Sequence, residues 1–345
     1  MKLVIDDKIP YIRGEAERLG ETVYLRGDSI SAADVRHADV LIIRTRTRCD
    51  RQLLEGSSVR FIATATIGYD HLDTDYLAQA GIAWTNCPGC NAASVAQYIH
   101  SSLLLLDEAG HIHLPETTVG IVGVGHVGSK VAQAAEALGC RTLLCDPPRQ
   151  ERGEQGFCTL ADIAAQADVV TFHTPLTRSG RHATLHMADT AFFNSLQRCP
   201  VIINSGRGEV VDEVALKAAL DSEKVRSAVI DTWEHEPNID RNLLERVFLG
   251  TPHIAGYSAD GKANGTRMAL EAVARHFGLD FSFHIQAPAL PADYAYSVEH
   301  FSPHHPHAPY LRCYDPRRDS DALKSKPEDF ERLRGDYPLR REFFS

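Results

Sequence analysis

The chain lacks several features that would place it in other protein classes. No apolar run approaches the roughly 20 residues that a membrane-spanning helix needs. The N-terminal stretch MKLVIDDKIPY has two aspartates where a signal peptide would continue its apolar core. Basic residues are outnumbered by acidic ones, 36 to 46, and the net charge of −10 argues against general attraction to nucleic acid or anionic lipid. We therefore expect a cytoplasmic protein that binds neither nucleic acid nor membrane.

Cysteine is too sparse for a disulfide framework. The 345 residues contain eight cysteines, scattered along the chain, and we expect most of them to be reduced small hydrophobes. Cys87 and Cys90 form one CxxC pair, a spacing found in redox and metal sites. The pair stands alone, and the Pro–Gly between its members favours a turn. We therefore expect a loop at this position and no bound metal.

Short apolar runs alternate with amphipathic stretches along most of the chain. Such alternation is typical of parallel sheets built from βαβ units, and the length indicates at least two domains. We predict an α/β protein with two doubly wound parallel-sheet (Rossmann-like) domains. The expected strands are 2–5, 38–44, 59–68, 117–124, 141–146, 168–174, 200–206 and 225–233, and the expected helices include 11–20, 50–56 and 93–110.

Gly123, Gly125 and Gly128 form a GxGxxG motif between a strand-like run and a helix-like one. The first glycine permits a tight turn, the second lets the backbone approach a pyrophosphate, and the third brings helix and strand together. The start of the helix supplies free amides and a favourable dipole for phosphate. In this context the motif predicts a dinucleotide site.

Asp146 ends the next expected strand, 18 residues beyond Gly128. A carboxylate at this position accepts hydrogen bonds from a ribose diol and repels a 2′-phosphate, which favours NAD over NADP. Arg149, three residues further on, could soften that preference. The predicted cofactor is therefore NAD.

A second group of polar residues follows the later strands. Arg207 lies between two glycines, and its planar guanidinium can hold a carboxylate through two hydrogen bonds. His253 can exchange a proton near neutral pH, and a carboxylate such as Glu236 would fix its tautomer. Taken alone, Arg207 also fits a surface ion pair, and His253 fits a packed loop. Together the three residues indicate hydride transfer from an alcohol that carries a carboxylate.

Six motifs stand in an order that is typical of one known family. They are GxGxxG at 123–128, Asp146, HTPL at 173–176, INSGRGEVVD at 203–212, DTWEHEP at 231–237 and TPHIAGYS at 251–258. Over about residues 1–285 the chain resembles the D-isomer-specific 2-hydroxyacid dehydrogenases. The resemblance implies that His253 is the acid/base, that Glu236 orients it, and that Arg207 holds the substrate carboxylate.

The resemblance also implies the binding residues. Contacts to NAD are expected from Gly123, Gly125, His126, Val127, Gly128, Asp146, Thr174, Asn204, Ser205, Gly206, Arg207, Asp231 and Gly256. Contacts to the substrate are expected from Thr45, Thr66, Tyr257, Arg44 and Arg46.

A cluster of cations suggests how a phosphorylated substrate would be bound. Arg44, Arg46 and Arg48 occupy alternate positions of an expected strand end, so they would share one face and could neutralise a phosphate. The alternative is a solvated sheet edge.

The resemblance divides the chain into three parts. They are a substrate-binding lid domain of residues 1–93 and 256–285, an NAD domain of residues 94–255, and a dimerisation region of residues 286–345. Closure of the lid would exclude water from the reaction. We expect a homodimer. The last part also holds histidines that could bind a metal but, among prolines, more often bind nothing: His300, His304, His305 and His307.

The expected reaction is the NAD-dependent oxidation of a small phosphorylated D-2-hydroxy acid to its 2-oxo acid. Two alternatives stay open. A relative that acts on phosphoglycerate, glyoxylate or hydroxypyruvate would use the same fold, cofactor and catalytic residues. A non-catalytic protein that senses NADH would use the fold without turnover, although the intact arginine, glutamate and histidine set favours an enzyme.

Overall fold

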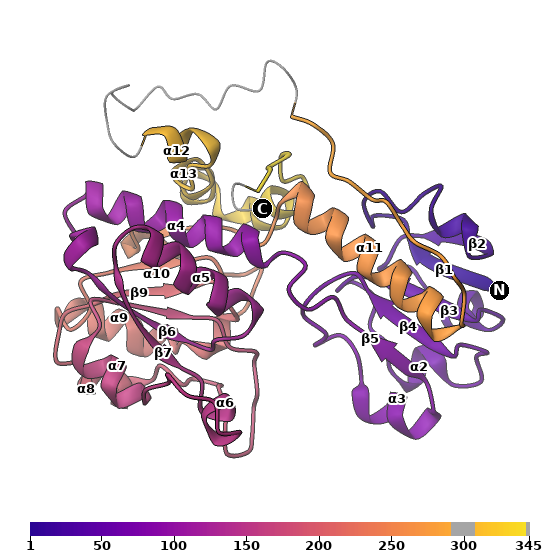
Figure 1. Ribbon diagram of the computed structural model, residues 1–345, viewed down its shortest axis with the longest axis horizontal. Helices are drawn as coiled ribbons and strands as arrows, with labels where there is room; N and C mark the ends of the chain where they lie inside the picture. The colour runs from indigo at the N-terminus through magenta and orange to yellow at the C-terminus, as the bar shows by residue number, and fades with distance from the viewer. Residues whose placement is uncertain (291–307, 343–345) are drawn as a thin grey trace. The chain divides into compact units, whose positions relative to one another are not determined.

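The computed structural model describes residues 1–290 and 308–342. Contacts divide the chain into two compact units, Met1–Asn91 with Ser258–Ala289, and Ala92–Tyr257 with Leu290–Ser345. Each unit is built on its own parallel sheet, of five and six strands (Figure 1). The predicted fold class is confirmed, whereas the three-part domain boundaries stay a prediction.

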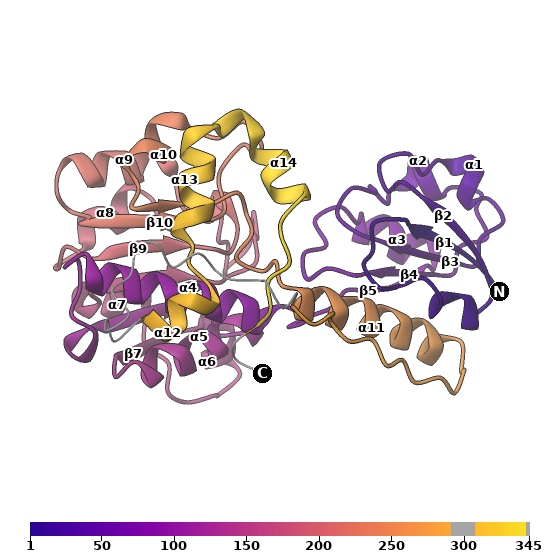
Figure 2. The same cartoon turned by 90° about the horizontal axis from the view of Figure 1, so that it is seen from above.

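The first unit is a five-stranded sheet covered by helices on both faces, in the order β2-β1-β3-β4-β5. Because successive side chains of a strand point to opposite faces, Leu3 and Ile5 pack on the side of α11, and Val4 packs on the side of α1, α2 and α3. Figure 2 shows α11 on one side of the strands and α1 and α2 on the other. The elements are β1 (Lys2–Asp6), η1 (Ala16–Arg18), β2 (Glu21–Leu25), α1 (Ala32–Val35), β3 (Val40–Ile43), α2 (Arg51–Leu54), β4 (Phe61–Thr64), α3 (Thr74–Ala80), β5 (Ala83–Thr85) and α11 (Ala259–His276).

The helix predicted at 11–20 is wrong, because only η1 forms there. Tyr11 and Gly14 have left-handed backbone angles, φ 60° and φ 87°, which interrupt a right-handed helix. Strands β2 and β5 were not predicted, and β3 ends at Ile43, one residue before the expected end. Most of the correctly predicted strands are buried runs, and the partly exposed strand at Arg141–Cys145 is an exception.

The second unit is a six-stranded parallel sheet in the order β11-β10-β9-β8-β6-β7. β7 pairs with one edge of β6 and β8 with the other, so the strand order reverses between β6 and β8. Ligands of doubly wound sheets bind outside the carboxyl ends of the strands at such a reversal. The elements are α4 (Ala92–Glu108), η2 (Leu114–Glu116), β6 (Thr118–Val122), α5 (His126–Ala137), β7 (Arg141–Cys145), α6 (Pro147–Glu151), α7 (Leu160–Gln166), β8 (Val169–Phe172), α8 (Thr190–Ser195), β9 (Val201–Asn204), η3 (Gly208–Val210), α9 (Glu213–Asp221), β10 (Ser227–Ile230), α10 (Arg241–Arg246) and β11 (Leu249–Gly250).

Both faces of this second sheet are covered, and the C-terminal helices take part. Leu311 and Tyr314 join the apolar cluster of α4 and α5, and Leu323 and Phe330 join the cluster of α7 to α10. These helices are α12 (Ala308–Cys313), α13 (Arg317–Ser325), η4 (Pro327–Asp329) and α14 (Phe330–Gly335). The histidines considered as metal ligands, His300, His304, His305 and His307, lie outside the described residues.

The cysteine pair lies in a buried loop of the first unit. The Cys87 Sγ donates to the carbonyl oxygens of Thr64, at 3.3 Å, and Gly265, at 3.2 Å. Burial raises the pKa of the Cys87 thiol. All eight cysteines are free thiols.

No helix in residues 1–290 or 308–342 is long and apolar enough to cross a membrane.

Candidate active site

The GxGxxG turn joins β6 to α5 in a conformation that its glycines permit. Gly123 has φ +88°, and a Cβ there would lie 2.8 Å from the backbone carbonyl of His173, which follows β8. A Cβ on Gly128 would lie 2.0 Å from the Gly123 carbonyl oxygen. A Cβ on Gly125 would meet nothing within 4 Å. Gly123 and Gly128 thus serve close packing, whereas the space at Gly125 leaves the turn open to a phosphate.

Asp146 follows β7 and directs its carboxylate to the same turn. Its Oδ2 accepts the Val124 N–H at 2.9 Å, and its Oδ1 accepts the Arg149 N–H at 3.1 Å. The Arg149 guanidinium donates to the Val124 carbonyl at 2.6 Å and to Glu154 at 2.8 Å. The acid expected to select NAD therefore lies beside the glycine turn, and Arg149 is engaged by Glu154.

Three hydroxyls lie just beyond the carboxyl ends of neighbouring strands: Thr174 after β8, Ser205 after β9 and Thr232 after β10. Each hydroxyl oxygen is buried and has no hydrogen-bond partner among the described residues. Since buried polar groups are normally hydrogen-bonded, this row fits a polar ligand laid along the sheet edge, as a dinucleotide would be. Thr174 and Ser205 are among the predicted NAD contacts, and Thr232 is not.

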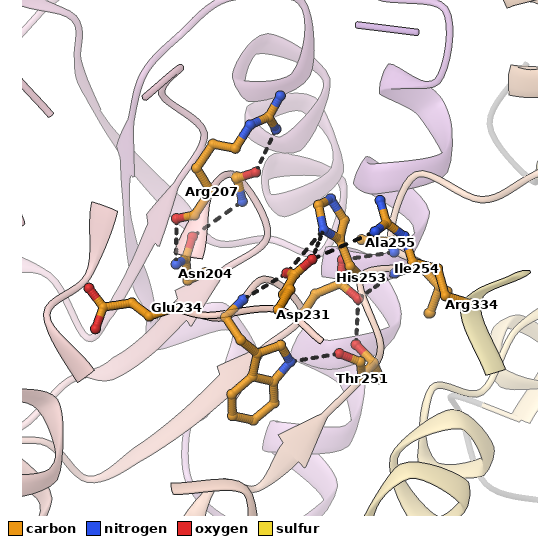
Figure 3. Close-up of polar contacts among 12 residues, drawn as sticks. Asn204, Arg207, Asp231, Glu234, Thr251, His253, Ile254, Ala255 and Arg334 are labelled. Carbon is orange, nitrogen blue, oxygen red and sulfur yellow. Dashed lines mark hydrogen bonds and ion pairs between the residues drawn. The ribbon is translucent and has the colours of Figure 1, made fainter. Parts of the chain in front are cut away.

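Glu236 and His253 face one another across two loops that follow β10 and β11. The His253 Nδ1–H donates to the Glu236 Oε2 at 2.8 Å and lies 3.1 Å from Oε1 (Figure 3). The Trp233 N–H donates to Oε1 at 3.0 Å. Burial raises the pKa of Glu236, but His253, this N–H and Arg334 together outweigh burial and lower it below its usual value. With Nδ1 held by a carboxylate, proton exchange falls to Nε2.

Asp231 fixes the loop that carries His253. Its Oδ1 accepts the Ile254 N–H at 2.7 Å and the Thr251 hydroxyl at 2.6 Å, and its Oδ2 accepts the Ala255 N–H at 2.9 Å (Figure 3). Burial raises the pKa of Asp231. This predicted NAD contact thus also shapes the loop of the proposed base.

Arg207 lies in the turn between β9 and η3. Asn204 shapes the turn, since its amide donates to the Arg207 carbonyl at 2.9 Å. The Arg207 Nη1 donates to the Gly206 carbonyl at 2.9 Å, and in Figure 3 the guanidinium lies apart from His253. A Cβ on Gly208 would lie 2.0 Å from the Trp233 carbonyl oxygen. The glycine after Arg207 therefore allows this turn to approach the loop of Glu236.

The predicted substrate residues occupy varied surroundings. Thr45 is exposed in the turn after β3. The Thr66 hydroxyl lies 2.7 Å from that of Thr64 and donates to the Gly68 carbonyl at 2.9 Å. The ring of Tyr257 lies edge-on to Tyr337, with ring centroids 6.0 Å apart. None of these three contacts identifies a substrate.

The arginines expected on one strand face are not on a strand. β3 ends at Ile43, and the following residues form a turn, so the alternation argument fails. Arg44 donates to both carboxylate oxygens of the buried Asp6, at 2.9 and 3.2 Å. Arg48 donates to Asp50 at 3.0 Å, and Arg46 is exposed. Arg44 therefore has a structural role that the sequence pattern did not reveal.

Two further arginines reach this site from the C-terminal segment, residues 308–342, and sequence reasoning missed both. The Arg334 Nη1 lies 3.7 Å from the Glu236 Oε2. Arg340 is 1% exposed, and its Nη2 donates to the Ala255 carbonyl at 2.6 Å and to the Ser94 hydroxyl. No local pattern signals either contact, because the partners lie far apart in the sequence.

Comparison with known proteins identifies the class that this fold and site define. Residues 105–255 match the D-isomer specific 2-hydroxyacid dehydrogenase, NAD binding domain. This range contains the glycine turn, the acid after β7 and the paired glutamate and histidine. The chain belongs to the D-isomer-specific 2-hydroxyacid dehydrogenase family, and the prediction of NAD as cofactor is confirmed.

Within this family the chain is similar over almost its whole length to erythronate-4-phosphate dehydrogenases. It is 55% identical to that of Bacteroides fragilis, over 99% of this chain and 97% of the relative. It is 44% identical to that of Porphyromonas gingivalis, over 99% and 94%. The stretches ATATIGYDHLD, PGCNA and HIAGYSADGKANGT resemble the same enzyme, and this predicted relationship is confirmed.

Solved structures show the same fold. D-lactate dehydrogenase from Aquifex aeolicus, complexed with NAD and lactic acid, has a TM-score of 0.68 and 24% identity, and covers 81% of this chain and 96% of its own. An NADPH-dependent glyoxylate/hydroxypyruvate reductase from Sinorhizobium meliloti has a TM-score of 0.70 and 26% identity, and covers 83% and 97%. These structures leave roughly a fifth of this chain unmatched.

Proposed function

We propose that the chain catalyses the NAD-dependent oxidation of 4-phospho-D-erythronate to (R)-3-hydroxy-2-oxo-4-phosphooxybutanoate, in pyridoxal 5′-phosphate (vitamin B6) biosynthesis. The observation that carries the proposal is the Glu236–His253 hydrogen bond, 2.8 Å long, at the same sheet edge as the glycine turn. The full-length similarity to erythronate-4-phosphate dehydrogenases supports this choice of substrate.

The proposed chemistry divides among three side chains. When bound, NAD supplies the acceptor for the hydride that leaves C2. The His253 Nε2 takes the proton of the C2 hydroxyl, and Glu236 stabilises the imidazolium that results. Arg207 binds the substrate carboxylate through its guanidinium, which orients C2. The cofactor would be held by the turn at Gly125, by Asp146 and by the row of buried hydroxyls.

The proposal also covers the substrate contacts, the oligomeric state and the cellular compartment. We retain Thr45, Thr66, Tyr257, Arg44 and Arg46 as proposed substrate contacts, on the strength of the family resemblance. A homodimer is proposed on the same ground, and light scattering should then give twice the mass of the chain. A cytoplasmic setting is proposed because free thiols persist in a reducing compartment.

The decisive experiment follows NADH absorbance with a panel of D-2-hydroxy acids. We expect kcat/KM for 4-phospho-D-erythronate to exceed that for 3-phosphoglycerate, lactate and glycerate by at least about 100-fold, since each well-formed contact contributes a factor of about ten or more. Preference for another acid would reassign the substrate within the family. Tight NADH binding with no turnover on any acid would indicate the sensing protein instead.

A further inference from the structure

Arg334 is a cation at the proposed active site to which no role has been assigned. It belongs to α14, its Nη1 lies 3.7 Å from the Glu236 Oε2, and Figure 3 shows its side chain near His253. The centre of its guanidinium lies 5.9 Å from the ring centroid of Tyr257, a proposed substrate contact. Its Nε is buried and has no hydrogen-bond partner among the described residues. A guanidinium is thus held next to the proposed base, and its Nε–H has no acceptor among the described residues.

Arg334 is held by a well-packed segment. Phe330, at the start of α14, is fully buried in the apolar cluster of the second unit. The Tyr337 hydroxyl donates to Asp319 at 2.8 Å, and Arg340 donates to the Ala255 carbonyl in the loop of His253. These anchors lie on both sides of Arg334, so its position does not depend on a flexible tail.

Arg334 lies near the Glu236 carboxylate but does not form a hydrogen bond with it. The Nη1–Oε2 separation is 3.7 Å, longer than a hydrogen bond. The carboxylate already accepts from His253 and from the Trp233 N–H. Arg334 therefore contributes charge near the pair while its donors remain available to a second anion.

The proposed substrate presents such an anion. It carries a carboxylate, which we assign to Arg207, and a phosphate ester with a charge of about −1.5 to −2. A guanidinium is well suited to phosphate because its parallel N–H groups match two phosphate oxygens. The dehydrogenases named for lactate and for glyoxylate or hydroxypyruvate cover 81% and 83% of this chain. The erythronate-4-phosphate dehydrogenases match 99% or more of it.

We propose that Arg334 is a substrate-binding residue that donates hydrogen bonds to the phosphate ester of the substrate. The inference rests on the proposed function for its substrate. It extends that function by assigning recognition of the phosphate to the C-terminal segment, in addition to any contact made by Arg46.

The test compares two substrates and three variants. The substrates are 4-phospho-D-erythronate and unphosphorylated D-erythronate. R334Q should lower kcat/KM for the phosphorylated acid by about 100-fold, mainly through KM, and change it less than about 3-fold for the other acid. R334K, which keeps the charge, should recover part of the loss. R332Q is the matched control, because Arg332 lies on the same helix, pairs with Asp329 and is 59% exposed.

A binding measurement separates this inference from the proposed function. Inorganic phosphate is titrated calorimetrically into the NADH-loaded protein, and the wild type and R332Q should bind it at least about tenfold more tightly than R334Q. Equal losses on both substrates would make Arg334 a brace for Glu236 and overturn the inference, as would unchanged phosphate binding. Absence of turnover with retained, Arg334-dependent phosphate binding would count against the substrate alone. Should R334Q fail to fold, R334K supplies the comparison between the two substrates, with a smaller loss expected on the phosphorylated acid only.

Discussion

Glu236 shows how one buried carboxylate is kept ionised. Burial alone would raise its pKa, but the His253 ring, the Trp233 N–H and the nearby Arg334 lower it instead. The proposed base is therefore paired with a charged partner across the neutral pH range. This charge is what would stabilise the imidazolium formed when the substrate hydroxyl loses its proton.

Replacing Glu236 by glutamine should remove the charge and keep the size. We expect E236Q to lower kcat/KM by about 10²- to 10⁴-fold, because the ring loses both its preferred tautomer and its counter-charge. Steady-state kinetics on 4-phospho-D-erythronate measure the loss. The control is E234Q, since Glu234 pairs with His186 and not with the proposed base, and it should stay within about threefold of wild type. Equal activity of E236Q and wild type would contradict the proposed role.

Glu213 provides a pH test that is independent of catalysis. Burial raises its pKa to about 7, and its Oε1 accepts the Glu234 N–H at 2.9 Å. Between about pH 4.5 and pH 7 the folded protein keeps the Glu213 proton, whereas the unfolded chain has lost it. The free energy of unfolding therefore falls as the pH rises through this range.

E213Q keeps an acceptor and removes the titration. We expect the variant and the wild type to unfold at similar temperatures near pH 4.5, and the variant to unfold several degrees higher at pH 8. Thermal scans across this range measure the difference. A constant offset between the two proteins at every pH would show that Glu213 does not titrate in this way.

The single residues differ in how far the sequence could predict them. Asp146 and His253 sit in short motifs, so their type and spacing were informative. Arg44 seemed available for a phosphate, yet it binds Asp6, a partner 38 positions away in the chain. Arg334 meets Glu236 across an even longer separation. Ion pairs of this kind arise from tertiary folding and leave no local periodicity.

At the scale of elements, two glycines of the β6–turn–α5 unit have different roles. One allows close packing, and the other leaves room for a ligand. Gly128 is required because α5 approaches the turn closely, whereas Gly125 borders open space. The two glycines of one motif should therefore respond differently to an added methyl group.

Alanine substitutions test this difference. G128A should lower the unfolding temperature by several degrees, because its Cβ would lie 2.0 Å from a backbone oxygen. G125A should fold as the wild type does and bind NAD at least about tenfold more weakly, because its methyl group would occupy space next to the phosphates. Thermal scans and NADH fluorescence titrations give both values. Normal cofactor affinity in G125A would place the phosphates elsewhere.

The elements themselves were predictable to different degrees. In the second sheet, the fully buried strands β6, β8, β9 and β10 were each placed within a few residues. The partly exposed β7 was also predicted, whereas the two-residue β11 was not. β2 is half-exposed along its length, so its apolar signal is weak. The stretch 11–20 has helix-forming residues, but the left-handed angles at Tyr11 and Gly14 prevent a helix. Local propensity was overruled there by the path that the chain takes back to the sheet.

At the scale of the whole molecule, residues distant in sequence complete one site. Arg340 donates hydrogen bonds both to the Ala255 carbonyl and to the Ser94 hydroxyl on α4. It therefore connects the His253 loop to α4. Its guanidinium also lies 4.2 Å from the ring centroid of Tyr314, over the aromatic face. The stability of this loop therefore depends on Arg340, which lies in the irregular stretch that follows α14.

R340M keeps the apolar stem and removes the donors. The Ala255 carbonyl keeps the Ser94 hydroxyl as a donor, at 2.9 Å, and the loss of a hydrogen bond from a charged group costs about 1.5–3 kcal/mol. We expect a lower unfolding temperature by several degrees and a lower kcat, with NAD affinity changed less than about threefold. R332M is the control, since Arg332 is exposed. A variant with wild-type kcat would show that the loop keeps its shape without this support.

The anchoring of the His253 loop by Arg340 has a consequence for synthesis. A ribosome makes the nucleotide-binding sheet first and the supporting guanidinium long afterwards. The His253 loop therefore acquires this hydrogen bond only after Arg340 has been made. Chains that end before Arg340 would carry the sheet without this support for the His253 loop.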